Sequence, residues 1–300
     1  MLELAPGWKS DRLLTHDSDR VPSRGAAKIP YFRAGASPAN ATPPTDKGTP
    51  IHTPSLTDCG APINAARVKV CAFGLSAIPV GKHNIKDPRL DETHKLVEAK
   101  KKAYAQVDVV GDAELVDADC VVTDEDGFLE LVFRDVDFIE NRLERDPSEE
   151  EKAALLKLKI QLEDDHTVHD AGLGSEDREA LAIHSFTTDK PVIVASAEEL
   201  AQPDSLMVRV FRESGWICFL TVGGSENKAW PIPAATTAWE AGGAIHSDIQ
   251  HGFIRAEIIG YDDFIEAGGE TLAKRADKQR LETKTYVIQD YDLTNFRFNK

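Results

Sequence analysis

The sequence has few cysteines, and they are not close together. The 300 residues contain four, Cys59, Cys71, Cys120 and Cys218, with no C-x-x-C pair among them. This scatter predicts buried free thiols, rather than disulfides, in a protein that stays in a reducing compartment.

Long apolar runs are missing as well. No stretch approaches the ~18 consecutive apolar residues of a membrane span, and the first residues do not contain the compact apolar core of a signal peptide. Asn40-Ala-Thr42 fits a glycosylation sequon, but nothing else points to secretion. We therefore expect a cytoplasmic protein that makes no contact with membranes.

Basic residues are in the minority, and the formal net charge is −16. Residues 68–215 carry 18 Lys and Arg against 33 Asp and Glu, whereas residues 216–300 carry 9 against 12. An acidic middle repels nucleic acid and keeps a chain soluble. The C-terminal part is therefore the least unfavourable folded surface for a polyanion.

The length predicts two or three compact units rather than a single core. Residues 1–66 are rich in Pro, Ser, Thr, Gly and Ala and show little apolar periodicity. Such a segment buries too little apolar surface to offset its ordering entropy, so it is expected to be a disordered tail. A short ordered piece at residues 30–33 is the alternative.

The last 95 residues, 206–300, have the pattern of a small β-grasp, ubiquitin-like domain. Strands are expected at residues 216–222, 229–233, 253–261, 285–289 and 295–299, with a helix at residues 238–249. Arg255 and Glu257 fall on the face of their strand opposite to Ile254 and Ala256.

Several motifs in this region occur in one order over some 85 positions. They are His246-Ser-Asp248, Gly252-Phe-Ile-Arg-Ala256, Tyr261-Asp-Asp-Phe264, Gly268-Gly-Glu270, Arg280-Leu-Glu282, Tyr286-Val-Ile-Gln-Asp290 and Phe296-Arg-Phe-Asn299. Together they resemble the C-terminal TGS domain of the Obg-like ATPases, the YchF group. The resemblance implies a relation to proteins that bind ATP and are associated with ribosomes and translation.

A strand at residues 68–73 leads into Gly74 and then Gly81-Lys82-His83, which invites comparison with a P-loop. A P-loop requires G-x-x-x-x-G-K-[ST], because backbone N–H groups and Lys hold the phosphates and a hydroxyl holds Mg²⁺. Here six residues separate the two glycines, and His83 replaces the Ser or Thr. Asp87-Pro88 also leaves little room for the helix whose N-terminus would bind phosphate.

The family resemblance accounts for this departure. Asp87-Pro-Arg-Leu-Asp91 resembles the motif after switch I, Asp108-Val-Val-Gly111 the D-x-x-G motif, and Ser196-Ala-Glu-Glu199 the base-recognising N-x-x-E without its Asn. The helix after the P-loop, switch I and most of switch II are then deleted. The resemblance thus implies a vestigial nucleotide site made of Gly74, Gly81, Lys82, Asp108, Gly111, Ser196 and Glu199.

The middle of the chain is expected to form a reduced GTPase-like α/β domain, residues 67–205. Its strands are predicted at residues 68–73, 105–110, 119–122 and 191–195. A helical hairpin insert is predicted at about residues 128–184. Its first helix has Leu129, Val132, Phe133, Val136, Ile139 and Leu143 on one face, and its second has a capping box of Ser148 and Glu151 followed by Leu155, Leu158 and Leu162.

Residues 164–170 contain two histidines three positions apart beside several aspartates, which are ligand types for a metal. No ligand elsewhere in the sequence is tied to them. The segment is therefore interpreted as a polar turn, and no metal site is predicted.

Three hypotheses of function remain. The first is a non-enzymatic binding protein for ribosomes, structured RNA or a translation-related protein, without a cofactor. The second is a residual ATP- or GTP-binding protein or hydrolase that uses Mg²⁺ with Lys82, Asp108 and Glu199. The third is a structural remnant that pairs with a full-length relative. The missing Mg²⁺ hydroxyl, switch I and Asn disfavour hydrolysis, since each such contact contributes strongly to catalysis.

A basic cluster gives the first hypothesis a candidate surface. Lys274, Arg275, Lys278, Arg280 and Lys284 lie close together in the sequence, and Arg255 is expected on a neighbouring strand. At helical spacing Lys274 and Lys278 would share a face. The alternative is a solvated helix whose charges balance locally.

Overall fold

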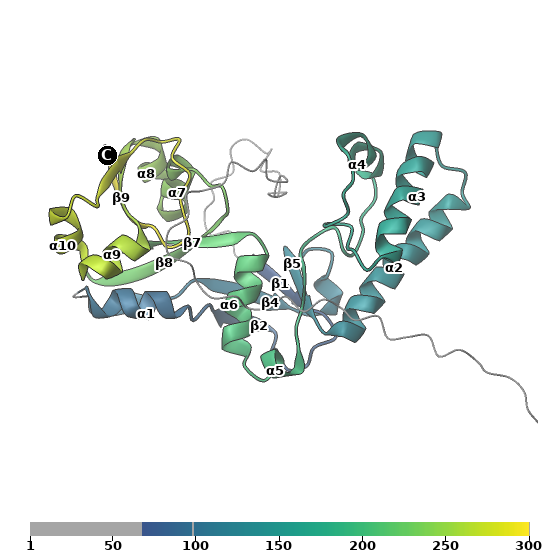
Figure 1. Ribbon diagram of the computed structural model, residues 1–300, viewed down its shortest axis with the longest axis horizontal. Helices are drawn as coiled ribbons and strands as arrows, with labels where there is room; N and C mark the ends of the chain where they lie inside the picture. The colour runs from purple at the N-terminus through teal and green to yellow at the C-terminus, as the bar shows by residue number, and fades with distance from the viewer. Residues whose placement is uncertain (1–67, 98, 300) are drawn as a thin grey trace, which may run out of the picture. The chain divides into compact units, whose positions relative to one another are not determined.

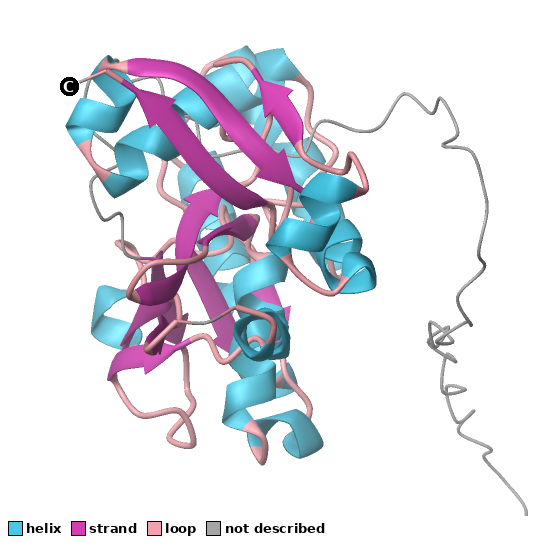
Figure 2. Cartoon of the chain, turned by 90° about the vertical axis from the view of Figure 1, so that its left-hand side faces the viewer, coloured by secondary structure: helices cyan, strands magenta, loops and turns pink. Residues whose placement is uncertain are grey.

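The computed structural model describes residues 68–97 and 99–299, all within one compact unit. The predictions for residues 1–66 and for Cys59 lie outside the described residues. The described part contains two β-sheets with helices packed on them (Figures 1 and 2).

The first sheet has five strands in the order β2-β4-β1-β5-β6. They are β1 (Val68–Ala72), β2 (Gly81–Asn84), β4 (Gln106–Val110), β5 (Cys120–Thr123) and β6 (Val192–Val194). Four of them are parallel neighbours, and these four were predicted from their Val- and Ile-rich runs, which are typical of strands covered on both faces. The antiparallel edge strand β2 was not predicted, because its sequence Gly-Lys-His-Asn is polar.

Six helices are described between residues 88 and 213. They are α1 (Pro88–Lys95), α2 (Glu125–Leu143), α3 (Glu149–Glu163), α4 (Ser175–Leu181), α5 (Ala197–Leu200) and α6 (Pro203–Glu213), with a 3-10 turn η1 (Asp112–Glu114). Figure 1 shows α3 beside both α2 and α4, and a core that includes Leu155, Leu158 and Leu162 joins them, as predicted for these three leucines.

The buried face of α2 differs from the predicted one. Leu129 and Phe133 were expected to be buried, but they are 43% and 63% exposed. Leu131 and Asp135 are buried instead. The reason is that α2 packs on the sheet through Leu131 as well as on α3, which turns its buried sector away from the predicted stripe.

Only half of the capping box predicted for α3 forms. The hydroxyl of Ser148 accepts a hydrogen bond from the backbone N–H of Glu151. The Glu151 carboxylate does not return the bond, because it pairs with Arg142 at 2.7 Å and with the imidazole of His184 at 2.7 Å. The side chain therefore joins three segments rather than closing one helix.

The second sheet has six strands in the order β10-β9-β11-β7-β8-β3. They are β3 (Lys101–Ala103), β7 (Trp216–Thr221), β8 (Glu226–Pro233), β9 (Phe253–Ile259), β10 (Arg280–Glu282) and β11 (Leu293–Phe298). The helices of this region are α7 (Ala238–Ile245), α8 (Ser247–His251), α9 (Tyr261–Ala267) and α10 (Glu270–Arg275). The small side chains of α7 pack on one face of the sheet with Phe219, Ile258 and Phe296.

Three predictions in this region need correction. The helix expected at residues 238–249 is two helices, because the backbone of His246 is extended and its side chain caps α8. Residues 285–289 are not a strand; only Val287 makes an isolated bridge, to Thr237. Strands β3 and β10 were not predicted, since their sequences are short and charged.

The two sheets share a core. Strand β3 precedes β4 in the chain but pairs with β8 in the second sheet. One apolar cluster contains Val70 and Val107 of the first sheet together with Cys218 and Leu220 of the second. The predicted boundary near residue 205 thus falls within α6, whose residues Val210 and Phe211 belong to the same cluster.

The described cysteines are buried and free, as predicted. They are Cys71, Cys120 and Cys218. Burial raises the pKa of the Cys71 thiol to about 11 and that of Cys120 to about 12. These thiols are therefore protonated and unreactive near neutral pH.

In residues 68–97 and 99–299, no helix is long and apolar enough to cross a membrane. Within the same ranges, no three His, Cys, Asp or Glu side chains lie where they could hold a metal ion. The segment of residues 164–170 is a turn after α3 in which His166 contacts the Asp164 carbonyl at 3.0 Å and Thr167 donates to Asp170 at 2.9 Å.

Candidate functional site

The loop after β1 is the place where a nucleotide phosphate would bind in a P-loop protein. Gly74 begins this loop in the left-handed conformation, with φ of 69°. Its backbone N–H donates to the carboxylate of Asp112 at 3.1 Å. A carboxylate therefore takes the N–H that would face a phosphate, and its negative charge opposes a second anion there.

Gly81 and Lys82 do not belong to this loop. Both lie on β2, where Lys82 is opposite Asp108 on β4. Asp108 is also opposite Lys69 on β1, so the aspartate lies between two lysines in the middle of the sheet. Gly111 follows β4 and accepts a hydrogen bond from the Cys71 thiol at 3.7 Å.

Ser196 and Glu199 lie at the other edge of the same sheet, where β6 ends. They form a reciprocal capping box at the start of α5: Ser196 Oγ accepts from the Glu199 N–H, and Glu199 accepts from the Ser196 N–H at 2.9 Å. A hydrogen bond from Arg209 lowers the pKa of the Glu199 carboxyl. These contacts explain both residues without a nucleotide.

A hollow of about 490 Å³ opens beside them, at the ends of β5 and β6. Its lining includes the acidic residues Asp124, Glu125, Asp126 and Glu199. Four carboxyl groups in one hollow repel phosphate. The structure thus does not bring the seven predicted nucleotide-binding residues together around one anion site.

The C-terminal sheet offers a different candidate. On β9 and β11, the face away from α7 carries Arg255, Glu257, Asn295 and Arg297, here named the arginine face. Arg255 lies directly opposite Arg297, and Glu257 directly opposite Asn295. Arg297 Nε donates to Glu257 at 2.7 Å and Asn295 donates to the same carboxylate at 2.8 Å.

Electrostatics on the arginine face are unbalanced. Burial alone would raise the pKa of Glu257, but hydrogen bonds from Asn295 and Arg297 outweigh burial and lower it. Glu257 thus neutralises Arg297. Arg255 is exposed, and its guanidinium donates to the carbonyl of Ile254 at 3.1 Å. Among the described residues, Arg255 has no ion pair. Like charges directly opposite each other destabilise a sheet, and here Glu257 offsets only the charge of Arg297.

The other predicted basic residues are dispersed. Lys274 pairs with Glu270 at 2.6 Å on α10, whereas Lys278 lies beyond that helix and pairs with Asp263 at 2.8 Å. The two do not share a helical face, because the chain turns at Asp277, with φ of 59°. Arg275 is the last residue of α10, Arg280 packs on the ring of Tyr286, and Lys284 lies in the following turn.

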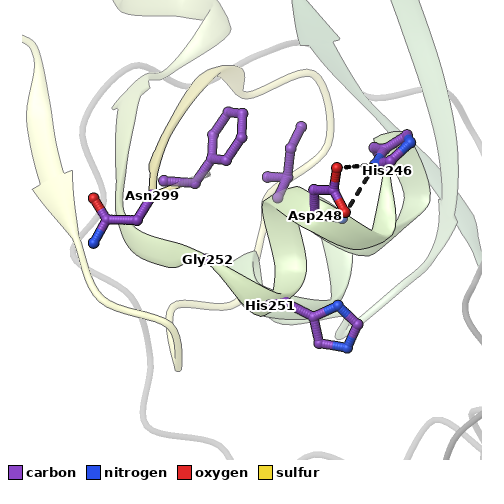
Figure 3. A pocket seen from close by; sticks show the side chains of 7 residues that line it. His246, Asp248, His251, Gly252 and Asn299 are labelled. Carbon is purple, nitrogen blue, oxygen red and sulfur yellow. Dashed lines mark hydrogen bonds and ion pairs between the residues drawn. The ribbon is translucent and has the colours of Figure 1, made fainter.

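A pocket of about 710 Å³ lies at the end of β11, next to α8. It is lined by His246, Asp248, Ile249, His251, Gly252, Phe298 and Asn299, and is named here the β11 pocket. Figure 3 shows His246 and Asp248 turned toward each other. His246 Nδ1 accepts the Asp248 backbone N–H at 3.1 Å, so its Nε2 carries the proton of the neutral ring.

Gly252 shapes this pocket. Its carbonyl accepts a hydrogen bond from the Asn299 N–H at 2.9 Å. A Cβ at this position would lie 1.9 Å from the Asn299 carbonyl oxygen. Only glycine therefore lets the end of β11 come this close to the chain between α8 and β9.

Sequence reasoning found Arg255 but not Arg297, Asn295 or the pocket. The alternation of Asn295 and Arg297 with Phe296 and Phe298 was a signal that could have found the first two. The pocket had no comparable signal, because its residues come from segments about 50 positions apart that only the fold brings together.

Comparison with known proteins identifies the C-terminal region. Residues 216–299 match the family "YchF-GTPase_C: Protein of unknown function (DUF933)". Residues 216–299 are therefore a domain of this family, named here the YchF domain. The YchF domain contains both the arginine face and the β11 pocket.

Relatives with known names align over the same region. The "Ribosome-binding ATPase YchF" of Pasteurella multocida is 52% identical over 81 residues, which is 27% of this chain and 22% of that protein. The protein of the same name from Bacillus subtilis is 42% identical over 106 residues, 34% of this chain and 29% of that protein. Each alignment thus spans less than a third of the relative.

A solved structure extends the likeness in fold. The chain entitled "Structure of the Schizosaccharomyces pombe YchF GTPase" superposes with a TM-score of 0.58 at 16% sequence identity, covering 77% of this chain and 97% of that one. The match supports an α/β fold followed by a C-terminal domain.

Proposed function

We propose that this protein is a ribosome-associated, non-enzymatic binding protein derived from an Obg-like ATPase. The observation that carries the proposal is the contrast between the YchF domain and the region that contains the loop at Gly74. The YchF domain aligns closely with proteins named for ribosome binding. In the loop after β1, by contrast, the backbone N–H of Gly74 donates a hydrogen bond to the carboxylate of Asp112 and is not free for a phosphate. Neither ATP, GTP nor Mg²⁺ is needed for the activity proposed here, and the location would be cytoplasmic.

The domain assignment follows the same comparison. We assign residues 67–205 to a reduced GTPase-like domain, with α2 and α3 as the helical hairpin insert. Residues 206–300 are assigned to a TGS domain. The order β8-β7-β11-β9-β10, with β11 parallel to β7 and α7 between β8 and β9, supports a β-grasp fold for it.

The arginine face is the proposed contact with ribosomal RNA. Arg255 is exposed, and among the described residues it has no acidic partner, because Glu257 pairs with Arg297 opposite it. An RNA phosphate would supply Arg255 with a negative partner and would give position rather than sequence preference.

The test is sedimentation of the full chain with purified ribosomes at low and high salt. We expect the wild type to sediment at low salt and to be released at high salt, because phosphate contacts release counterions. Arg255→Glu should weaken binding, while Lys152→Glu on α3, with the same change in net charge, should not. Absence of the wild type from the ribosomal pellet at low salt would overturn the proposal.

The same sedimentation assay, repeated with ATP or GTP and Mg²⁺, tests the alternative that the protein is a residual nucleotide-binding protein. We expect no change in sedimentation on addition of nucleotide. Release or retention that depends on nucleotide and on Lys82 would favour the alternative.

A further inference from the structure

We propose that the β11 pocket holds one unpaired RNA base and that it prefers guanine. The inference rests on the proposed contact with RNA and names the part of RNA that the YchF domain reads. At about 710 Å³ the pocket is within the range of sites for small molecules. Ile249 and Phe298 give it apolar lining, and an aromatic side chain is the usual stacking partner of an unstacked base.

The polar groups of the pocket suit the edge of a base better than a phosphate. Among the described residues, the lining contains no Lys or Arg, and it contains the carboxyl group of Asp248, which opposes an anion. The side chain of Asp248 is 72% exposed and 3.5 Å from His246, so its oxygens remain open to further donors.

Guanine matches this set of groups. Its Watson–Crick edge has one acceptor, O6, followed by two donors, N1–H and the N2 amino group. A carboxylate such as Asp248 accepts both donors, while the Nε2–H of a neutral imidazole such as His246 donates to O6. Adenine and cytosine place a ring acceptor where guanine has N1–H, and a carboxylate repels that lone pair.

The pocket and the arginine face adjoin along the chain. Arg297 is followed directly by Phe298 and Asn299 of the pocket, and Gly252 is three residues before Arg255. The same two strands thus lead from phosphate-binding groups to the base-binding groups. A single strand of RNA with one base in the pocket could run along β9 and β11 with its phosphates at the arginines.

The experiment measures binding of the full chain to fluorescently labelled heptamers of uridine with a central guanosine, inosine or adenosine. We expect guanosine to bind about 10-fold more tightly than adenosine, the usual value of one bidentate contact. Inosine, which has no N2 amino group, should fall between them. Asp248→Asn should abolish the preference, whereas Asp262→Asn, an exposed acid on α9, should keep it.

The outcomes separate this inference from the proposed function. Equal affinity for the three heptamers, or no binding to any of them, would overturn the base pocket; if the wild type still sediments with ribosomes, the proposed function stands. If the wild type neither binds the heptamers nor sediments with ribosomes, both the base pocket and the proposed function are overturned. Arg255→Glu should weaken binding of all three heptamers by the same factor, since Arg255 contacts phosphate and not the base.

Discussion

Arg89 lies 2.7 Å from the carboxylate of Asp290, which is 201 positions later in the chain. The same guanidinium donates to Asp87 at 2.9 Å and stacks on Tyr291, with its carbon 3.7 Å from the ring centre. Asp87 and Arg89 belong to the segment whose resemblance was to a motif after switch I. In this structure that segment joins α1 to the YchF domain.

The first prediction tests this junction. Arg89→Met should lower the free energy of unfolding by about 3 kcal/mol, because it leaves the buried carboxylate of Asp87 with fewer partners. Urea denaturation followed by circular dichroism measures the change. Arg145→Met is the control, since Arg145 is exposed and pairs with no acid among the described residues, and its effect should stay within about 0.5 kcal/mol. Equal effects of the two variants would contradict the structural role of Arg89.

The second prediction concerns pH. Burial alone would raise the pKa of Asp87, but hydrogen bonds and charge from Arg89, with the charge of Arg212, outweigh it and hold the pKa below its ordinary 3.8. The charged carboxylate thus stabilises the fold above that value, and the contribution is lost as the pH falls through the lower folded pKa.

Asp87→Asn isolates this contribution. At pH 7 the variant should be less stable than the wild type by about 2 kcal/mol, since bonds to a charged acceptor are replaced by bonds to a neutral one. The difference should stay constant down to pH about 5 and shrink below the ordinary 3.8. Urea denaturation curves at several pH values measure it, and a difference that grows on acidification would refute the assignment.

The strands show what the sequence could predict. The strands β1, β4, β5 and β6 were expected because their apolar runs fit a sheet covered on both faces. The strands β2, β3 and β10 were not, because they are short, polar and at or near sheet edges. Backbone hydrogen bonds to a neighbouring strand hold them, and such bonds leave no pattern in the side chains.

The candidate site was predictable to a similar degree. Arg255 was expected on an exposed strand face, and it is there. Its position opposite Arg297 depends on the register of two strands that are 40 positions apart, which one sequence does not specify. The helical face proposed for Lys274 and Lys278 was wrong because α10 ends at Arg275, after fewer than two turns.

The third prediction examines the loop at Gly74. Calorimetry with ATP and with GTP, each with Mg²⁺, should give no dissociation constant below about 1 mM for the wild type. Asp112→Asn removes the charge that opposes phosphate, yet it should not restore binding, because Lys82 lies on β2 and not in the loop. Micromolar binding of a nucleotide by the wild type that is lost in Lys82→Ala would contradict the conclusion that this loop does not bind phosphate.

The last prediction concerns Gly252 and the floor of the β11 pocket. In Gly252→Ala, the added Cβ would lie 1.9 Å from the carbonyl oxygen of Asn299, so the end of β11 must move away. Because two backbone segments and no flexible side chain meet there, we expect a loss of about 3 kcal/mol in the free energy of unfolding. Gly172→Ala is the matched control: nothing lies within 4 Å of its Cβ, and its effect should be within about 0.5 kcal/mol. Urea denaturation of the two variants decides the point. If Gly252→Ala were as stable as the control, β11 would not be held against Gly252, and the pocket between α8 and β11 would not have the shape described above.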